Sequence, residues 1–147
     1  MRVSVIGGST ITDEQYAHAR GVGRQLGERG HELVCGGLSG VMEAACRGAR
    51  ETGGHTIGIL PMERRELAND YVDTAIATGM GNARNVIVVM NGDATIAVDG
   101  SNGTLSELGH ALDTERPVAG LGTFSLDGVE AVESATEAVD YVESAIK

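Results

Sequence analysis

Short apolar runs alternate along the chain with longer segments in which apolar positions recur every three or four residues. The short runs are rich in valine and isoleucine and predict β-strands, whereas the longer segments predict helices. Strand and helix in repeated alternation are typical of an α/β fold, a mostly parallel open sheet with helices on both faces. The predicted strands are Arg2 to Ile6, Glu32 to Cys35, Thr56 to Leu60, Asp73 to Ala77, Ala94 to Val98 and Val118 to Leu121.

Capping signals mark where the helices begin. Thr12 with Gln15 three residues later forms a capping box, which predicts a helix from Asp13 to about Arg29 that stops at Gly30. Other helices are predicted from near Gly40, from about Asn82 to Asn91, from Thr104 to about Asp113, and after a second capping box at Ser134. The helix after Gly40 carries small residues on one face, which predicts that it lies close to the sheet: Val41, Ala44, Ala45, Gly48 and Ala49.

One hydrophobic core is enough for a chain of 147 residues. No linker, low-complexity tract or repeat divides it, so residues 1–147 are expected to form a single Rossmann-like domain. The longest polar stretch between elements runs from Pro61 to Asp70. We expect a mobile loop there, over one edge of the sheet. It is either a lid or a solvated loop, and solvated loops are commoner.

Three predicted strands run directly into glycine-rich loops. The loops are Gly7-Gly8-Ser9-Thr10, Gly36-Gly37-Leu38-Ser39-Gly40 and Gly100-Ser101-Asn102-Gly103-Thr104. The C-terminal ends of parallel strands share one edge of the sheet, where ligands bind in open α/β folds. Turns between strand and helix favour glycine whatever they bind, so one such loop is weak evidence. Three at the same edge favour a site where the backbone approaches a ligand.

Two of these loops lead into predicted helices, near Gly40 and Thr104. Unpaired N–H groups and a partial positive charge at a helix start can receive a phosphate. Arg84 is expected at the same edge, where its planar guanidinium suits phosphate or carboxylate oxygens. The alternative is a surface arginine paired with an acid, and the scarcity of arginine near the loops favours ligand binding. Asn85 either bonds to the ligand or caps the following helix.

Thr104 and Glu107 have two interpretations. Thr-x-x-Glu at a helix start is a capping box, in which Glu107 bonds only to the backbone, and for an isolated motif this is the better interpretation. Beside a phosphate-binding loop, the same carboxylate would point into the crevice and orient a water or stabilise positive charge. Asp99, which precedes the loop, would repel an anion unless it turns away or binds ribose hydroxyls.

Charge and composition exclude several classes of function. The formal charge is −10 and no basic cluster offsets it, so we expect no binding to polymeric nucleic acid. The only lysine is Lys147, and a pyridoxal-phosphate enzyme needs an internal lysine for its Schiff base. No Gly-Lys-Ser/Thr sequence occurs, which excludes a Walker-type loop. An acidic surface nearly without lysine is typical of a halophilic, salt-loving source.

The remaining residue types indicate no metal, disulfide or membrane segment. His18, His31, His55 and His110 lack metal-ligand spacing, and the two cysteines are expected to be small buried residues. No apolar run reaches the roughly 18 residues that span a bilayer. The N-terminus enters a strand without the features of a signal peptide, so we expect a cytoplasmic protein.

Three segments together resemble the Lonely-guy-like (LOG-like) Rossmann superfamily, over most of the chain. They are Cys35 to Ala45, Arg84-Asn85 and Asn102 to Glu107. The chain looks most like the short branch that includes molybdenum-cofactor carrier proteins, members of which have been labelled lysine decarboxylases. Phosphoribohydrolases of the superfamily carry Pro-Gly-Gly-x-Gly-Thr-x-x-Glu. Here Asp99 replaces the proline, Ser101 replaces the second glycine, and Asn85 stands where those enzymes usually have lysine.

The resemblance implies two alternative functions, neither of which requires a further cofactor. An enzyme would cleave a nucleoside 5′-monophosphate to free base and ribose 5-phosphate, with Arg84 and Glu107 as catalytic residues. A carrier would hold a nucleotide or the molybdenum cofactor without turnover. Family members usually form dimers, so a homodimer or higher homo-oligomer is expected. The expected ligand-binding residues are Gly7, Gly8, Ser9, Gly36, Gly37, Asn85, Gly100, Ser101, Asn102, Gly103 and Thr104.

Overall fold

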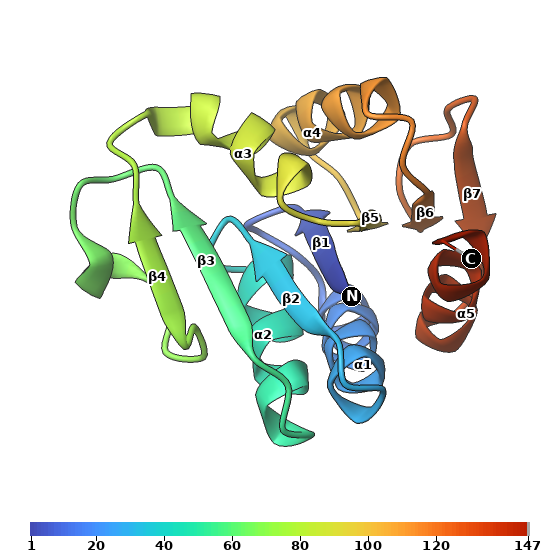
Figure 1. The fold of residues 1–147 in the computed structure, drawn as a ribbon, viewed down its shortest axis with the longest axis horizontal. Helices are drawn as coiled ribbons and strands as arrows, with labels where there is room; N and C mark the ends of the chain where they lie inside the picture. Colours follow the sequence, from blue (N-terminus) through green and yellow to red (C-terminus); the bar gives the residue numbers. More distant parts are fainter. Residues whose placement is uncertain (147) are drawn as a thin grey trace.

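Seven strands form one open sheet in which every neighbouring pair is parallel (Figure 1). The computed structural model describes residues 1–146. Strand addition reverses direction between β1 and β5, and this switch point is where open α/β folds bind ligands. From edge to edge the strands are β4 (Thr74–Ala77), β3 (Thr56–Leu60), β2 (Glu32–Cys35), β1 (Arg2–Gly7), β5 (Ala94–Val98), β6 (Val118–Leu121) and β7 (Val129–Val132).

Six of these strands agree with the predicted ones to within one residue. The sequence did not predict β7, which contains the exposed residues Glu130 and Ala131 and pairs only with β6. An edge strand needs no continuous apolar run, because one of its sides stays in contact with water. The pattern that revealed the central strands is therefore missing here.

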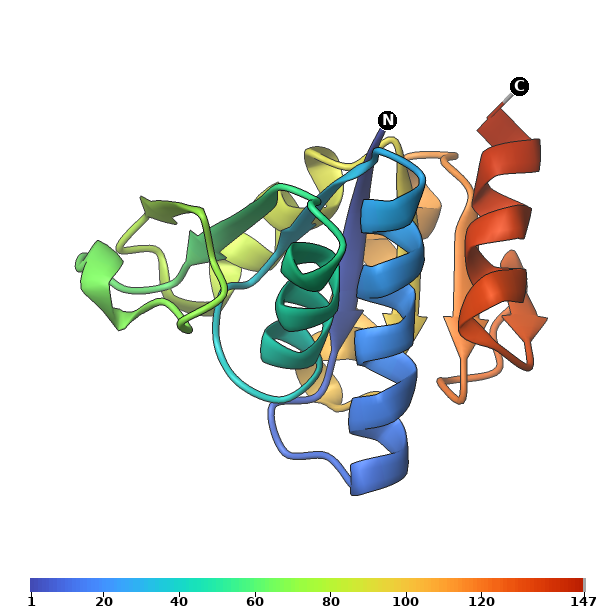
Figure 2. The same ribbon diagram turned by 90° about the horizontal axis from the view of Figure 1, so that it is seen from below.

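Helices cover both faces of the sheet, which confirms the predicted α/β Rossmann-like class (Figures 1 and 2). Val3 and Val5 of β1 are buried under the first group of helices and Ile6 under the second, as the alternation of a strand requires. The first group is α1 (Asp13–Glu28), α2 (Val41–Glu51) and α5 (Ala135–Ile146), and the second is α3 (Asn85–Met90) and α4 (Asn102–Asp113).

The predicted capping box starts α1. The Gln15 N–H donates to Thr12 Oγ1 at 3.2 Å, and the Thr12 N–H donates to Gln15 Oε1 at 2.8 Å. The small-residue face of α2 is buried as predicted, but it packs on α1 as well as on the sheet, side by side with it in Figure 2. A Cβ on Gly48 would lie 2.0 Å from the backbone oxygen of Arg20, so only glycine permits this contact. Among the described residues, no helix is both long and apolar enough to span a membrane.

The polar segment from Pro61 to Asp70 contains a short 3-10 helix, η1 (Arg65–Leu67). It contacts the loop that follows β2: the Asn69 N–H donates to the Gly37 oxygen at 2.9 Å, and Asn69 Nδ2 donates to the Leu38 oxygen at 2.8 Å. None of its residues lines the cavity described below, so nothing in this arrangement favours a lid over the solvated-loop interpretation.

Candidate functional site

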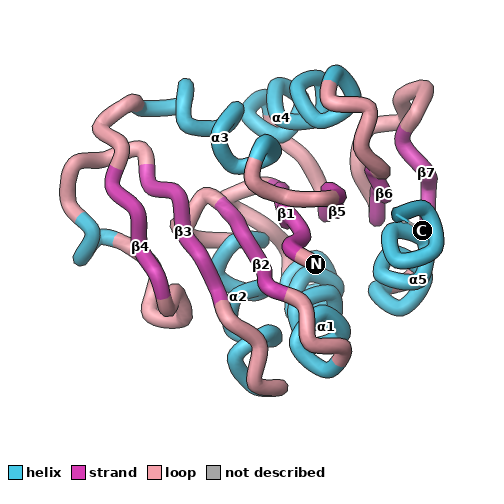
Figure 3. The backbone as a smooth tube through the Cα atoms, in the orientation of Figure 1, coloured by secondary structure: helices cyan, strands magenta, loops and turns pink. Residues whose placement is uncertain are grey.

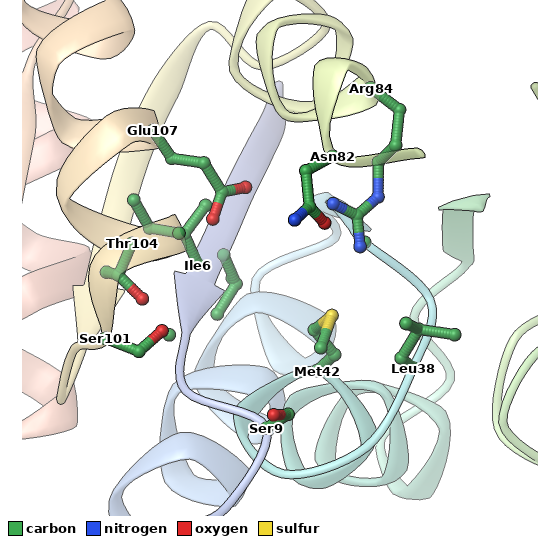
Figure 4. Close-up of a pocket in the computed structure, with 13 residues that line it drawn as sticks. Ile6, Ser9, Leu38, Met42, Asn82, Arg84, Ser101, Thr104 and Glu107 are labelled. Carbon is green, nitrogen blue, oxygen red and sulfur yellow. The ribbon is translucent and has the colours of Figure 1, made fainter. Parts of the chain in front are cut away.

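The loops that follow β1, β2 and β5 end at one edge of the sheet, as the sequence predicts (Figure 3). Together with the 3-10 helix η2 (Gly81–Arg84) and the start of α4 they enclose a cavity of about 250 Å³ (Figure 4). We call it the switch-point cavity. It is lined by Val5, Ile6, Gly7, Ser9, Gly36, Leu38, Met42, Asn82, Arg84, Ser101, Gly103, Thr104 and Glu107.

The start of α4 presents unpartnered donors to this cavity. Ser101 is the N-cap residue, and its side chain makes no capping hydrogen bond. The Leu105 N–H donates to the Ser101 oxygen at 3.0 Å, whereas the N–H groups of residues 102–104 have no acceptor within the described chain. The hydroxyl of Thr104 is buried and also lacks a hydrogen-bond partner among residues 1–146. Such a helix start is suited to an anion.

The capping-box interpretation of Thr104 and Glu107 is wrong. The helix begins at Asn102, two residues earlier than predicted, so Thr104 lies inside the first turn and is not the N-cap residue. Glu107 consequently lies in the second turn, where its carboxyl group points into the cavity and not back to the helix start (Figure 4). A capping box requires both side chains at the helix end, and the observed start position removes that geometry.

Arg84 reaches the cavity from the opposite wall, and only 6% of its surface is exposed. Its Nε donates to the Ile59 oxygen at 2.9 Å and its Nη1 donates to Asn85 Oδ1. Burial lowers the pKa of Arg84, and the charge of Glu107 opposes that shift. Asn85 starts α3 without a side-chain cap and does not line the cavity. It holds Arg84, a role that neither of its predicted alternatives described.

Glu107 faces Arg84 across the cavity, and the two side chains form no ion pair among the described contacts. Only 8% of Glu107 is exposed. Burial raises its pKa to about 7, because the charged form loses water, while the charge of Arg84 acts in the opposite direction. A carboxyl group with this pKa exchanges its proton near neutral pH, as a general acid or base must.

Most of the predicted site residues line the switch-point cavity, but five do not: Gly8, Gly37, Asn85, Gly100 and Asn102. Gly37 faces β3, where a Cβ would lie 2.5 Å from Leu60 Cδ2. The Gly8 oxygen accepts the N–H of Val41 at 3.0 Å, so the start of α2 bonds to the loop after β1. The start of α2 is therefore less available to a phosphate than the sequence predicts, whereas the start of α4 is open.

Sequence reasoning missed five lining residues: Val5, Ile6, Leu38, Met42 and Asn82. Asn82 carried a usable signal, because it belongs to the same short helix as Arg84 and both side chains extend toward the cavity (Figure 4). Leu38 also carried one, because it lies in the glycine-rich loop after β2. Val5, Ile6 and Met42 carried none, since an apolar residue in a strand or a helix has the pattern of ordinary core.

Asp99 turns away from the cavity, one of the two alternatives that its position left open. Its Oδ1 accepts from Gln15 Nε2 at 2.8 Å, and it does not line the cavity. Its backbone has a φ of +56°, in the left-handed region. Proline, whose ring restricts φ to about −65°, cannot adopt this conformation.

These features define a class of protein: a Rossmann-type α/β protein with an anion-receptive cavity at the switch point of its sheet. The chain belongs to the SLOG cluster4 family, whose model matches residues 1–147. An uncharacterised protein of Archaeoglobus fulgidus is 44% identical over 149 residues, which cover 100% of this chain and 98% of that protein.

Two solved structures resemble the chain over nearly its whole length. The molybdenum cofactor binding protein from the phototrophic bacterium Rippkaea orientalis has a TM-score of 0.94 and 34% identity, and the match covers 99% of this chain and 97% of that one. The molybdenum cofactor carrier protein from Chlamydomonas reinhardtii has a TM-score of 0.89 and 32% identity, with the same coverage. The resemblance to the carrier-like branch is therefore confirmed.

The resemblance to LOG proteins is confirmed over a shorter region. A probable cytokinin riboside 5′-monophosphate phosphoribohydrolase of Oryza sativa is 39% identical over 90 residues. This match covers 59% of the present chain but only 37% of the rice protein, so the chain spans well under half the length of that relative.

Proposed function

We propose that this protein binds a small phosphorylated molecule in the switch-point cavity. The observation that carries the proposal is the set of unpartnered donors on its walls: the N–H groups of residues 103 and 104, the buried Thr104 hydroxyl and the Nη2 group of Arg84. A phosphate group offers enough acceptor oxygens for these donors, and buried donors gain most from charged acceptors. The remainder of the ligand would lie against Met42 and Leu38.

We propose the molybdenum cofactor, carried as cargo, as the ligand. The full-length similarity to proteins described as binding or carrying this cofactor supports the assignment. The turn between β5 and α4 supports it as well. The φ of +56° at Asp99 is inaccessible to the proline that phosphoribohydrolases have at this position. The loop therefore has a different backbone shape from a Pro-Gly-Gly loop, although it leads into the same kind of helix start.

Hydrolysis of a nucleoside 5′-monophosphate is the second candidate, favoured by one observation: Arg84 and Glu107 face each other across a single cavity. In its ionised form Glu107 would stabilise the positive charge that develops on the ribose ring or orient the attacking water. The helix start would hold the 5′-phosphate and thereby position the glycosidic bond. Arg84 would orient the carboxylate or the substrate.

Two measurements on the purified protein separate the candidates. In the first, the protein is incubated with AMP, GMP and CMP, and free base is quantified by chromatography, with Glu107→Ala as the control. In the second, the protein is mixed with molybdenum cofactor released from a molybdoenzyme, and co-elution of molybdenum and phosphorus is measured after gel filtration. A carrier retains the cofactor and releases no base above the control. A hydrolase releases base, and Glu107→Ala abolishes the release. If the protein neither retains the cofactor nor releases base, the phosphate site itself is refuted.

We further propose that the protein forms a homodimer through the face of the sheet covered by α3 and α4. Met90 on α3 is 56% exposed and Leu105 on α4 is 43% exposed, and an interface on this face would remove both from water. Light scattering after gel filtration is expected to give twice the monomer mass. Met90→Glu is expected to shift the mass toward the monomer, and a monomeric wild-type protein would refute the proposal.

A further inference from the structure

A second cavity, of about 430 Å³, opens at the same edge of the sheet. It lies between the first turns of α1 and the ends of β6 and β7, and we call it the β6–β7 cavity. Glu14 and His18 line it from α1, Thr123 and Phe124 from the loop after β6, and Glu133 from the end of β7. None of these residues takes part in the site described above.

The two cavities share one wall, the turn between β5 and α4. A Cβ on Gly100 would lie 2.6 Å from the Phe124 ring and 3.2 Å from Thr123 Oγ1, so these side chains pack directly on that turn. The next residue, Ser101, lines the switch-point cavity. In open α/β folds the two halves of a dinucleotide lie across the switch point, with their phosphates at the helix start between them. The two cavities here lie on either side of the turn that leads into α4.

The chemistry of the β6–β7 cavity suits a heterocyclic ring and disfavours a phosphate. The Thr123 hydroxyl is shielded from solvent and has no hydrogen-bond partner among the described residues. Phe124 offers an aromatic surface for stacking. Glu14 and Glu133 are the charged residues of the lining, which contains no lysine or arginine. Carboxylates repel an anion but accept hydrogen bonds from amino and ring N–H groups.

We propose that the β6–β7 cavity is a subsite for the second ring of a dinucleotide, one in which a diphosphate joins a nucleoside or pterin to a nucleoside with an amino-bearing base. The diphosphate lies at the start of α4, the first ring enters the switch-point cavity, and the second ring stacks on Phe124. This assignment rests on the phosphate site of the proposed function and extends the ligand class from one ring to two.

Calorimetric titration with three probes tests the subsite: AMP, ADP and P1,P2-di(adenosine-5′) diphosphate. ADP contains the same two phosphorus atoms as the dinucleotide but lacks its second ring, so it controls for the additional phosphate. The dinucleotide is expected to bind about tenfold more tightly than ADP, the gain typical of one base stacked on an aromatic side chain. Equal affinity for ADP and the dinucleotide would overturn the subsite while leaving the phosphate site intact. If none of the three probes binds although the molybdenum cofactor is retained, the subsite is overturned and the phosphate site stands. If the cofactor is not retained either, the phosphate site fails and this proposal fails with it.

A matched pair of variants tests whether the higher affinity for the dinucleotide arises in the β6–β7 cavity. His18→Trp fills the β6–β7 cavity from α1, whereas Ala17→Trp puts the same side chain on the adjacent, exposed position of that helix. In His18→Trp the affinity for the dinucleotide is expected to fall to that for ADP, with the affinity for ADP unchanged. Ala17→Trp is expected to keep the full difference. If both variants keep the difference, the second ring binds elsewhere and the proposal is refuted.

Discussion

Replacing Glu107 by glutamine is expected to stabilise the ligand-free protein at alkaline pH and to leave it unchanged at acid pH. Burial raises the pKa of this carboxyl group from 4.5 to about 7, and Arg84 compensates only in part. In the unfolded chain the group ionises near its ordinary value, whereas in the folded protein it keeps its proton to higher pH. Between these two values the folded state binds more protons, so its stability falls as the pH rises.

The magnitude follows from the difference of about 2.5 pKa units between the two states. Each unit corresponds to about 1.4 kcal/mol, so the ionised carboxylate costs the folded protein about 3 kcal/mol above pH 7. The part of the unfolding free energy that depends on protonated Glu107 is fully present below about pH 4.5. It is lost progressively up to about pH 7 and changes no further above that. Glutamine has nearly the same shape and never ionises, so Glu107→Gln removes this dependence.

Urea unfolding of both proteins at pH 4, 5, 6, 7 and 8 measures the effect. The difference in unfolding free energy between Glu107→Gln and wild type is expected to be near zero at pH 4 and about 3 kcal/mol at pH 8. Glu130→Gln, on the exposed edge strand β7, is the control and should show no such trend. Parallel pH profiles for Glu107→Gln and wild type would refute the claim that Glu107 is buried and weakly compensated.

Three further substitutions test the phosphate site through calorimetric titration with a nucleoside monophosphate. Arg84→Lys keeps the charge but loses the planar fork, so the affinity is expected to fall about tenfold, and an unchanged affinity would remove Arg84 from the site. Gly36→Ala puts a methyl group 2.8 Å from both Arg84 Nη2 and Met42 Sδ, so the affinity is expected to fall while circular dichroism stays unchanged; full affinity would show that the guanidinium position is not critical. Thr104→Val deletes a buried hydroxyl without a partner, so unfolding free energy should stay equal or rise by up to about 1 kcal/mol while affinity falls. A large loss of stability instead would mean that the hydroxyl is bonded within the protein.

Local patterns in the sequence determined the order of the central elements and the edge of the sheet at which the site lies. Strand period, apolar composition and the box at Thr12 and Gln15 each depend on residues close together in the chain, so they are visible without coordinates. The convergence of three glycine loops then followed from topology, because parallel strands end at a common edge. The same topology placed two charged residues at that edge: Glu107 shortly after the third loop, and Arg84 beyond the fourth predicted strand.

Only the tertiary structure decided what those residues contact. The helix start at Asn102 removed the capping role of Glu107, and the packing of Asn85 against Arg84 gave the amide a role that no local pattern indicated. Met42 became a cavity wall although its surroundings in sequence are those of core. The pKa of Glu107 depends on desolvation by elements that are far apart in the chain. Burial and distance arise from packing between segments, and so they exist only once the sheet and its helices have assembled.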